Sequence, residues 1–421
     1  MNAAPSSTSI SQLKTIVTLF VILRVTILLF YTPQGLLNAY SDYQYYYRVA
    51  QLSDQGYYPY LNSWSEQPPL QAYTWQAVYS LVHALTPTGG LDSISYQLFA
   101  RLLGGVMLIF EAGALILLHR IAVRTWDMER ANWVAWVYAV LSLPLFFWNI
   151  SQTGGVVFFT LLAIDLFLSK RYARSAVAVG LGIVIKFTPV FLLGPAVRFL
   201  LPAKRSIARY LVVMLITVGV VYAPFVLLGG GPWIVASLSA TGARASWSTP
   251  WALLDGNWDV GDVGDVGTRI HADLAIQTYG NPPTIPSILV LIAFGALYLW
   301  LFLRPIDPLG PKQFIWFTTL TAMLFLLWSK GWSPHWVTLF IPLILLSFPT
   351  SRGLNLLLLL TLFVFLEWPL SDSLHLPVLF ALAILARTAL FIVIAVLTAQ
   401  QLWSTHKTPE AVSTSGVSRA R

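Results

Sequence analysis

The chain has 421 residues, of which 57% are hydrophobic and only 10% are charged, with a mean hydropathy of +0.70. A water-soluble globular protein carries about a quarter charged residues, so this composition excludes that class. The net charge of +8 does not indicate a nucleic-acid partner, because the basic residues lie in short clusters between apolar stretches, as in the cytoplasmic loops of membrane proteins. The chain has no cysteine, which excludes disulfides and thiol chemistry.

The first half of the chain predicts a series of membrane-crossing helices, each about 17 to 25 residues long. A polar cytoplasmic tail, residues 1–14, precedes an apolar stretch at 15–31. This stretch lacks a small-residue cleavage site, so a retained helix is expected instead of a signal peptide. An external loop at 32–95 follows and contains an amphipathic interfacial helix at 71–85. The next crossings are predicted at 97–119, 133–149 and 153–168.

The segment 176–200 differs from the others because basic clusters flank it at both ends. A single crossing would leave one cluster on the wrong side of the membrane. Two half-length helices joined at Lys186-Phe187-Thr188-Pro189 would keep both clusters inside. Pro189 favours such a break because it lacks an amide hydrogen and restricts the preceding residue. This hinge would place Lys186 at the outer or central level of the membrane.

The second half begins with a crossing at 207–228 and a second external loop at 229–283. An Asp-Val-Gly repeat at 259–267 lacks the spacing and distal glutamate of a calcium loop, so a flexible acidic loop is expected. Further crossings are predicted at 284–303, 313–328, 334–348, 354–370 and 376–403, before a disordered cytoplasmic tail at 404–421. The fold class is an all-α polytopic membrane protein with about 10–12 helices, forming a single domain at 15–403.

Several ionisable residues fall near membrane segments, where charge is costly and usually faces a polar cavity. The predicted topology gathers them on the external side. A carboxylate that faces several cations suits a reaction in which a base removes a proton while a phosphate leaves. The carboxylates are Asp42 and Glu66, and the basic groups are Arg101, Lys186, Lys330 and His335.

Each of these residues also has a structural interpretation. Asp42 could be an ordinary acid beside the membrane, Glu66 a solvated turn residue, and Arg101 a helix-end cation that reaches the headgroups. Lys186 is harder to explain in this way, because apolar residues flank it for about ten positions on each side. Glu111 lies in mid-helix, so another helix must supply its partner.

The first external loop carries three short motifs in a fixed order. Asp42-Tyr43-Gln44 is followed by Gly56-Tyr57-Tyr58-Pro59-Tyr60 and then by Pro69-Leu70. This order resembles the multi-pass GT-C glycosyltransferases that use a polyprenyl-phosphate sugar. The pattern is most similar to the GPI mannosyltransferase I type and to the bacterial, GT87-like mannosyltransferases that depend on polyprenol-phosphate mannose.

Three further motifs extend the resemblance from about residue 15 to about residue 350. A basic-then-acidic second helix of the family is matched by Arg101 and Glu111. A Lys-aromatic-x-Pro hinge is matched at 186–189, and a late Lys…Ser turn is matched by Lys330 and 333–336.

The chain departs from the family at three positions of the site. Tyr40 replaces the first acid of the Asp-x-Asp found in the eukaryotic enzymes, Arg48 replaces a mid-loop Asp, and His335 replaces a late Gln. Asp42 therefore remains as the single carboxylate of that motif. A divalent metal is disfavoured, since hard cations bind several oxygen ligands.

The resemblance implies an inverting glycosyltransferase on the outer face of the plasma membrane, or of the endoplasmic reticulum membrane in a eukaryote. The donor would be a polyprenyl- or dolichyl-phosphate hexose, with mannose implied, and the acceptor a glycan or glycolipid. Asp42 would act as the base, and no cofactor is expected. The donor phosphate would be bound by Lys186, Lys330, Arg101 and His335, and the acceptor side supported by Glu66, Tyr43, Gln44, Glu111 and Trp251.

Two other classes of function remain open. A transporter or a flippase for lipid-linked glycans would also contain broken helices and intramembrane charges. The chain has no repeated halves, however, and its charged residues gather at one face instead of the midplane. A non-catalytic partner of another membrane enzyme is the third possibility.

Overall fold

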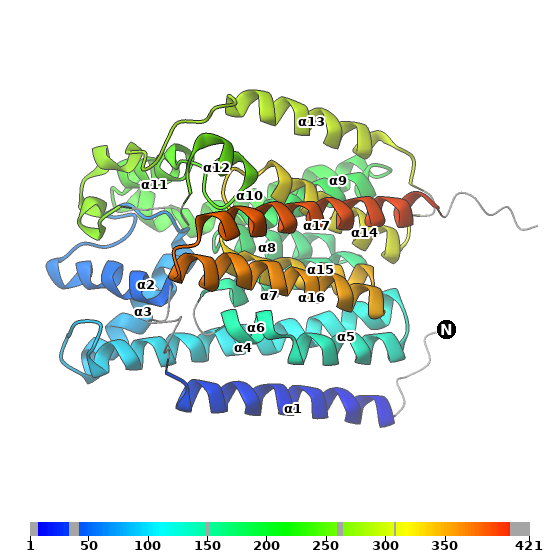
Figure 1. Ribbon diagram of the computed structural model, residues 1–421, viewed down its shortest axis with the longest axis horizontal. Coiled ribbons are helices and arrows are strands. Elements are labelled where there is room, and N and C mark those ends of the chain that lie inside the picture. Colours follow the sequence, from blue (N-terminus) through cyan, green and yellow to red (C-terminus); the bar gives the residue numbers. More distant parts are fainter. Residues whose placement is uncertain (1–6, 33–41, 149–150, 259–263, 307–308, 405–421) are drawn as a thin grey trace, which may run out of the picture.

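The computed structural model describes residues 7–32, 42–148, 151–258, 264–306 and 309–404. Within these residues the regular elements are all helical, and most run along the long axis of the molecule (Figure 1). The predicted all-α fold class is confirmed. The first helix begins and the last helix ends at the same end of the molecule (Figure 1), as expected if both termini lie on one side of a membrane.

Five helices of the described residues are long and apolar enough to cross a membrane. They are α1 (Ser7–Phe30), α4 (Ile94–Thr125), α10 (Lys204–Leu227), α16 (Ser351–Phe365) with its continuation η6 (Leu366–Ser371), and α17 (Pro377–Ser404). The first of these begins before the predicted residue 15, so it includes part of the predicted N-terminal tail.

Shorter helices fill the space between the long ones. They are α5 (Met128–Val140), α6 (Ser142–Phe147), α7 (Thr153–Leu168), α8 (Tyr172–Ile183), α9 (Leu193–Leu200), α13 (Ser287–Leu303), α14 (Pro311–Trp328) and α15 (Val337–Ser347). Helix α7 packs between α4 and α8, and α14 packs against α15 and α17. Residues of α14 and α15 are buried almost throughout, so these two helices form the centre of the apolar core. How many of the shorter helices cross the membrane stays a prediction.

Two of the predicted crossings are interrupted by proline. Instead of one helix at 133–149, the chain forms α5 and α6 with extended backbone at Leu141. A proline ring clashes with the carbonyl four residues before it, so Pro144 prevents the helix from continuing through Val140. The predicted crossing at 354–370 is similarly broken at Trp368, directly before Pro369. Residues 149 and 150 lie outside the described residues.

The hinge predicted around Lys186 is present in the structure. Helix α8 ends at Ile183, and the chain continues through η2 (Thr188–Leu192) into α9. Residues on both sides of this segment line the same cavity, so the chain turns back instead of crossing. They are residues 170–174, Ser206, Arg209 and Tyr210. Arg198 donates a hydrogen bond to the Arg304 carbonyl at the end of α13, which lies at this same end of the molecule.

Short helices from the two predicted external loops gather at the opposite end. Figure 1 shows α2 and α3 beside α11, at the end far from the start of α1. These helices are α2 (Asp42–Ala50), η1 (Gln51–Gln55), α3 (Pro69–Leu85), α11 (Gly231–Ala243), α12 (Pro250–Asp255), η3 (Val266–Ile270) and η4 (Ala272–Ile276). We call this the loop end, and we call the opposite end, with residues 120–130, 169–174 and 198–209, the basic end.

Two expectations fall outside the described residues in whole or in part. The tail predicted at 404–421 is described only at Ser404, and residues 259–263 of the Asp-Val-Gly repeat are not described. The end of the repeat forms η3, where the Asp265 side chain accepts a hydrogen bond from the Gly267 amide.

Candidate active site

Asp42 is the first residue of α2 at the loop end, and its side chain is 27% exposed. One turn further along the helix, the Tyr46 hydroxyl donates a hydrogen bond of 3.2 Å to the Asp42 carboxylate. The positive N-terminal end of the helix dipole also favours a negative charge at this position. Asp42 is therefore a partly accessible carboxylate with an imposed orientation.

Tyr46 is itself held by two residues of α3. Its ring stacks on Trp75 with a centroid distance of 4.4 Å, and its hydroxyl accepts a hydrogen bond from the Gln71 amide at 3.3 Å. Burial, together with the negative charge of Asp42, raises the pKa of Tyr46 well above its usual value. The Tyr46 hydroxyl thus keeps its proton and remains a donor to Asp42.

His335 approaches Asp42 from a distant part of the chain. It lies in η5 (Pro334–Trp336), between α14 and α15, and its Nε2 atom is 3.5 Å from a carboxylate oxygen of Asp42. The His335 side chain is only 14% exposed. A residue of the first loop and a residue of the late turn, both singled out from the sequence, are therefore neighbours.

Lys186 completes this arrangement from the hinge between α8 and η2. Its ammonium lies 4.5 Å from the centre of the Trp336 ring, within the range of a cation–π interaction. The negative charge of Asp42 attracts Lys186, and the positive charge of Arg244 repels it. The hinge, the first loop and the late turn therefore meet at one place, which we call the Asp42 cluster (Asp42, Tyr46, Lys186, Arg244 and His335).

Arg244 was not predicted from the sequence. It follows α11 and lies with its guanidinium carbon 4.1 Å from the centre of the Trp247 ring. Burial lowers the pKa of Arg244, although the charges of Glu66 and Asp42 oppose this effect. No local signal identifies this residue, because its relation to the other charged groups depends on how the two loops fold together.

Lys330 lies on the other side of the late turn. Its ammonium donates a hydrogen bond of 3.2 Å to the Gly242 carbonyl near the end of α11. Burial lowers the pKa of Lys330, and the negative charge of Asp255 partly offsets this effect. These contacts link Lys330 to the second loop; they do not join it to Asp42. Its predicted phosphate-binding role stays a prediction.

The late turn is fixed by backbone pairing with the second loop. The Trp247 amide donates to the Lys330 carbonyl, the Trp332 amide donates to the Trp247 carbonyl, and both hydrogen bonds measure 3.1 Å. A Cβ atom on Gly331 would lie 2.1 Å from the Trp247 ring, so only glycine allows this approach. The Trp247 ring also meets Trp336 edge-on, with centroids 6.0 Å apart.

Glu66 forms a separate, largely buried cluster beside the first. It is ion-paired with Arg269, whose side chain is fully buried, and it accepts a hydrogen bond of 2.8 Å from the Tyr45 hydroxyl. Burial lowers the pKa of Arg269, but the interactions with Tyr45 and Glu66 outweigh it and leave the pKa raised. Trp64 lies under the guanidinium at 4.1 Å. This cluster connects the two predicted external loops and neutralises the Glu66 carboxylate.

Three of the residues expected to support the acceptor make structural contacts. The Tyr43 hydroxyl donates to the Trp148 carbonyl at 3.2 Å, and the Trp251 indole donates to the Leu327 carbonyl at 3.1 Å. Glu111 accepts a hydrogen bond of 3.0 Å from Tyr138 of α5, which confirms that another helix supplies its partner.

The positions of two remaining site residues are less informative. Gln44 is half-buried on α2, two residues after Asp42. The Nε atom of Arg101 is buried without a hydrogen-bond partner among the described residues, and the interactions that define the Asp42 cluster do not include Arg101. Their roles stay predictions.

A buried ion pair that was not singled out from the sequence lies next to the late turn. Arg387 of α17 is paired with Glu367 of η6, and both side chains are almost fully buried. Arg387 also donates a hydrogen bond of 2.6 Å to the Ser248 carbonyl and lies 4.5 Å from the centre of the Trp332 ring. The signal in the sequence was the presence of one charged residue in each of two long apolar stretches.

Among the described residues, no group of three or more His, Asp or Glu side chains could hold a metal ion. Burial lowers the pKa of His335 to about 4, so its imidazole is neutral near pH 7. The Asp42 cluster combines one carboxylate with this imidazole and with two cations, Lys186 and Arg244. This combination can accept a proton and can stabilise a developing negative charge at the same place.

The chain is similar to solved structures of an oligosaccharyltransferase from Archaeoglobus fulgidus. The apo form aligns over 92% of this chain and 56% of that chain, with a TM-score of 0.44 and 12% identity. The form tethered to an acceptor peptide aligns over 92% and 55%, with a TM-score of 0.43 and 13% identity. This chain thus spans little more than half the length of those structures. A comparison with curated proteins found no match.

The model of one protein family matches more than half of the chain. It is described as Glycosyltransferase family 87 and covers residues 84–329. The matched region contains Lys186, Arg244 and Arg269, whereas Asp42 and His335 lie outside it. The sequence resemblance to GT-C type enzymes is confirmed, and the chain belongs to glycosyltransferase family 87 as a multi-pass membrane protein.

Proposed function

We propose that this glycosyltransferase moves a hexose from a polyprenyl-phosphate donor to a hydroxyl group of a glycan or glycolipid, with inversion at the anomeric carbon. The observation that supports this proposal most is the Asp42 cluster, where a carboxylate lies 3.5 Å from His335 and close to two cations. Mannose is the proposed sugar, on the resemblance of the first loop to enzymes that use polyprenol-phosphate mannose.

Asp42 is the proposed general base. It takes the proton of the acceptor hydroxyl while the hydroxyl oxygen forms a bond to the anomeric carbon. The bond between that carbon and the phosphate oxygen breaks at the same time, and its electron pair leaves with the polyprenyl phosphate. A single displacement of this kind inverts the anomeric centre and requires no covalent intermediate on the protein.

Lys186 and Arg244 are proposed to stabilise the departing phosphate. The phosphate gains a negative charge as it leaves, and cations that are already in place stabilise such charge strongly where water is excluded. Trp336 and Trp247 lie under these two cations at 4.5 Å and 4.1 Å. The aromatic rings hold the cations without neutralising their positive charge.

His335 and Tyr46 are proposed to set the position of the Asp42 carboxylate. His335 is 3.5 Å from one oxygen, and the Tyr46 hydroxyl is 3.2 Å from the same oxygen. With that oxygen held from two sides, the other can face the acceptor. Glu66 is already paired with Arg269, which makes it a less suitable base than Asp42.

The proposed location is the plasma membrane, or the endoplasmic reticulum membrane in a eukaryote, with the active site on the external face. The basic end carries most of the Lys and Arg clusters, as cytoplasmic loops do. The Asp42 cluster lies at the opposite, loop end of the molecule.

Transfer by the purified protein tests this function. The full chain in lipid nanodiscs is incubated with radiolabelled polyprenyl-phosphate mannose and a mixture of glycolipid acceptors, and the anomeric configuration of the product is determined. The proposal expects a labelled glycolipid with inverted configuration. In liposomes that contain the full chain, movement of the labelled donor across the bilayer without a new glycosidic bond would instead identify a transporter.

A further inference from the structure

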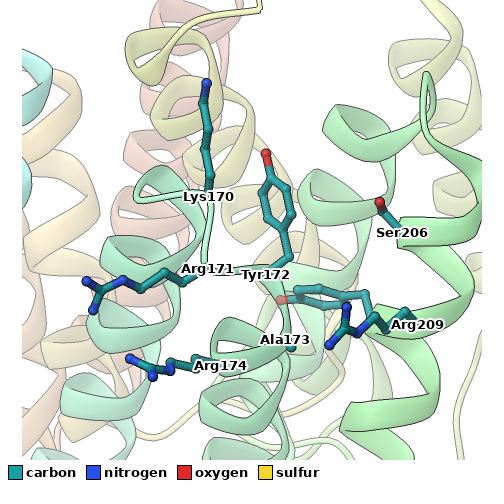
Figure 2. A pocket seen from close by; sticks show the side chains of 8 residues that line it. Lys170, Arg171, Tyr172, Ala173, Arg174, Ser206 and Arg209 are labelled. Atoms are coloured by element: carbon teal, nitrogen blue, oxygen red, sulfur yellow. The ribbon is translucent and has the colours of Figure 1, made fainter.

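A cavity of about 460 Å³ is lined by residues of the basic end, whose side chains are shown in Figure 2. One wall is formed by the link between α7 and α8 and by the first turn of α8, and the other wall by the first turns of α10. Four cations line the cavity, together with the hydroxyl group of Ser206. The cations are Lys170, Arg171, Arg174 and Arg209. The cavity lining contains no carboxylate.

The four cations of this cavity have no ion pair within the described part of the chain. Other cations of the basic end do have partners. Arg120 and Arg124 are paired with Asp165, and Arg198 donates to a carbonyl oxygen. The enrichment of Lys and Arg in cytoplasmic loops explains why such residues are numerous here. It does not explain why four of them surround a cavity without any counter-charge.

Figure 2 shows how the arginines are arranged around the cavity. The side chains of Arg171 and Arg174 extend in the same direction, away from Arg209, which projects from α10 on the other side. A guanidinium offers a planar pair of donors that matches the oxygens of a phosphate group. Arg171 and Arg174, which extend in the same direction, can therefore bind one phosphate-bearing group together.

The backbone at Lys170 supports a role for its side chain. Lys170 has a φ of +58°, a left-handed conformation in which glycine is favoured over residues with a Cβ atom. The turn is closed by hydrogen bonds of 2.9 Å from the Lys170 and Arg171 amides to carbonyls of α7. A lysine at a position that favours glycine costs stability, which a ligand-binding role would justify.

The outer face of α10 indicates where this ligand comes from. Val212, Ile216 and Val220 follow Arg209 at helical spacing and are 53%, 59% and 65% exposed. An apolar stripe that leads directly from a cationic cavity fits a molecule with a phosphate headgroup and acyl chains. Basic pockets between membrane helices on the cytoplasmic side bind the headgroups of anionic lipids.

We propose that this cavity binds the phosphate headgroup of an anionic phospholipid from the bilayer leaflet at the basic end, with its acyl chains along α10. The site is independent of the proposed transfer reaction, since it lies at the opposite end of the molecule.

Native mass spectrometry of the full chain with added lipids tests the proposal. Phosphatidylglycerol is compared with phosphatidylcholine for the wild type and for the double variant Arg171→Gln/Arg174→Gln. The matched control is Lys312→Gln/Arg352→Gln, which removes the same charge from the same end but outside the cavity. We expect phosphatidylglycerol binding to weaken by about tenfold or more in the cavity variant and to change little in the control.

A second variant separates binding from folding. Lys170→Gly relieves the left-handed backbone, so its thermal unfolding temperature should equal or exceed that of the wild type. Its affinity for phosphatidylglycerol should nevertheless fall. Equal binding of the two lipids by the wild type, or unchanged phosphatidylglycerol binding in both cavity variants, would overturn the proposal. The last measurement compares the binding of inorganic phosphate with that of phosphatidylglycerol. If inorganic phosphate binds as tightly as the lipid, the ligand is a soluble phosphate and not a lipid.

Discussion

The proposed chemistry depends on a few charged side chains that are partly accessible, while neighbouring charged side chains are paired. Asp42 has Tyr46 and His335 beside it but no arginine partner among the described ion pairs, whereas Glu66 is neutralised by Arg269. The Asp42 carboxylate lies near Lys186 and is 27% exposed. The contrast between these two acids is the main argument for Asp42 as the base.

Replacement of Lys186 by glutamine tests the role of the cation. The variant removes a charge that is proposed to stabilise the departing phosphate, so kcat/KM should fall by roughly 10²- to 10³-fold. Steady-state kinetics with the lipid-linked donor provide the measurement. Lys312→Gln is a matched control, because Lys312 also lies over a tryptophan ring, at 4.2 Å from Trp126, but at the basic end. A similar loss in both variants would show that the effect is structural.

Replacement of Tyr46 by phenylalanine tests the orientation of Asp42. The ring still stacks on Trp75, but the carboxylate loses its 3.2 Å hydrogen bond. A hydrogen bond to a charged group is worth about 1.5–3 kcal/mol, so kcat should fall by roughly tenfold or more while the fold is retained. Tyr47→Phe removes a hydroxyl of the same helix that binds the Gly89 carbonyl instead, and its kcat should stay near the wild-type value.

At the scale of elements, the site is assembled from segments that are each short and irregular. Three such segments contribute one residue each. Asp42 comes from helix α2, Lys186 from the hinge between α8 and η2, and His335 from the late turn before α15. None of these segments could hold its side chain alone. They are positioned by the packed helices behind them and by the pairing of Trp247 with Gly331.

Gly331→Ala tests this pairing. The new Cβ atom would lie 2.1 Å from the Trp247 ring, so the late turn must move. Overpacking of this kind costs about 1–3 kcal/mol, and it should lower both the thermal unfolding temperature and the activity, because His335 lies on the same turn. Gly295→Ala is the control. A Cβ atom there meets no other atom within 4 Å, and alanine favours a helix, so stability should be unchanged or higher.

At the scale of the whole molecule, the sequence predicted the helices well because apolar stretches and basic clusters reflect the membrane environment. The hinge at Lys186 followed from the same charge rule. Two breaks were missed, at Leu141 and Trp368, since the clash of a proline with the preceding turn was not weighed against a long apolar stretch.

The candidate site was predictable only in part. Asp42, Lys186 and His335 were identified and lie together, but Arg244 and Arg269 were not identified. Arg269 meets Glu66 from a loop about two hundred residues away, and such a pair depends on tertiary packing that no local pattern encodes. The same reason explains why Lys330 was expected near Asp42 although it binds the end of α11.

The buried pair of Arg387 and Glu367 connects the last helices to the loop end. Removing one partner of a buried ion pair leaves an uncompensated charge and costs about 3–5 kcal/mol. Arg387→Met should therefore lower the thermal unfolding temperature strongly in detergent, and Glu367→Gln together with Arg387→Met should restore part of the loss. If the double variant were less stable than Arg387→Met alone, the pair would not be the cause.

The central claim is that Asp42 is the base of a sugar transfer from a polyprenyl-phosphate donor. The most direct test is the single-turnover rate of transfer by Asp42→Asn in nanodiscs, with Asp92→Asn as the control, since Asp92 is an exposed acid of the same predicted loop. We expect Asp42→Asn to bind the donor but to transfer the sugar roughly 10²- to 10⁴-fold more slowly than the wild type, whereas Asp92→Asn remains active. Transfer by Asp42→Asn at the wild-type rate would contradict the central claim.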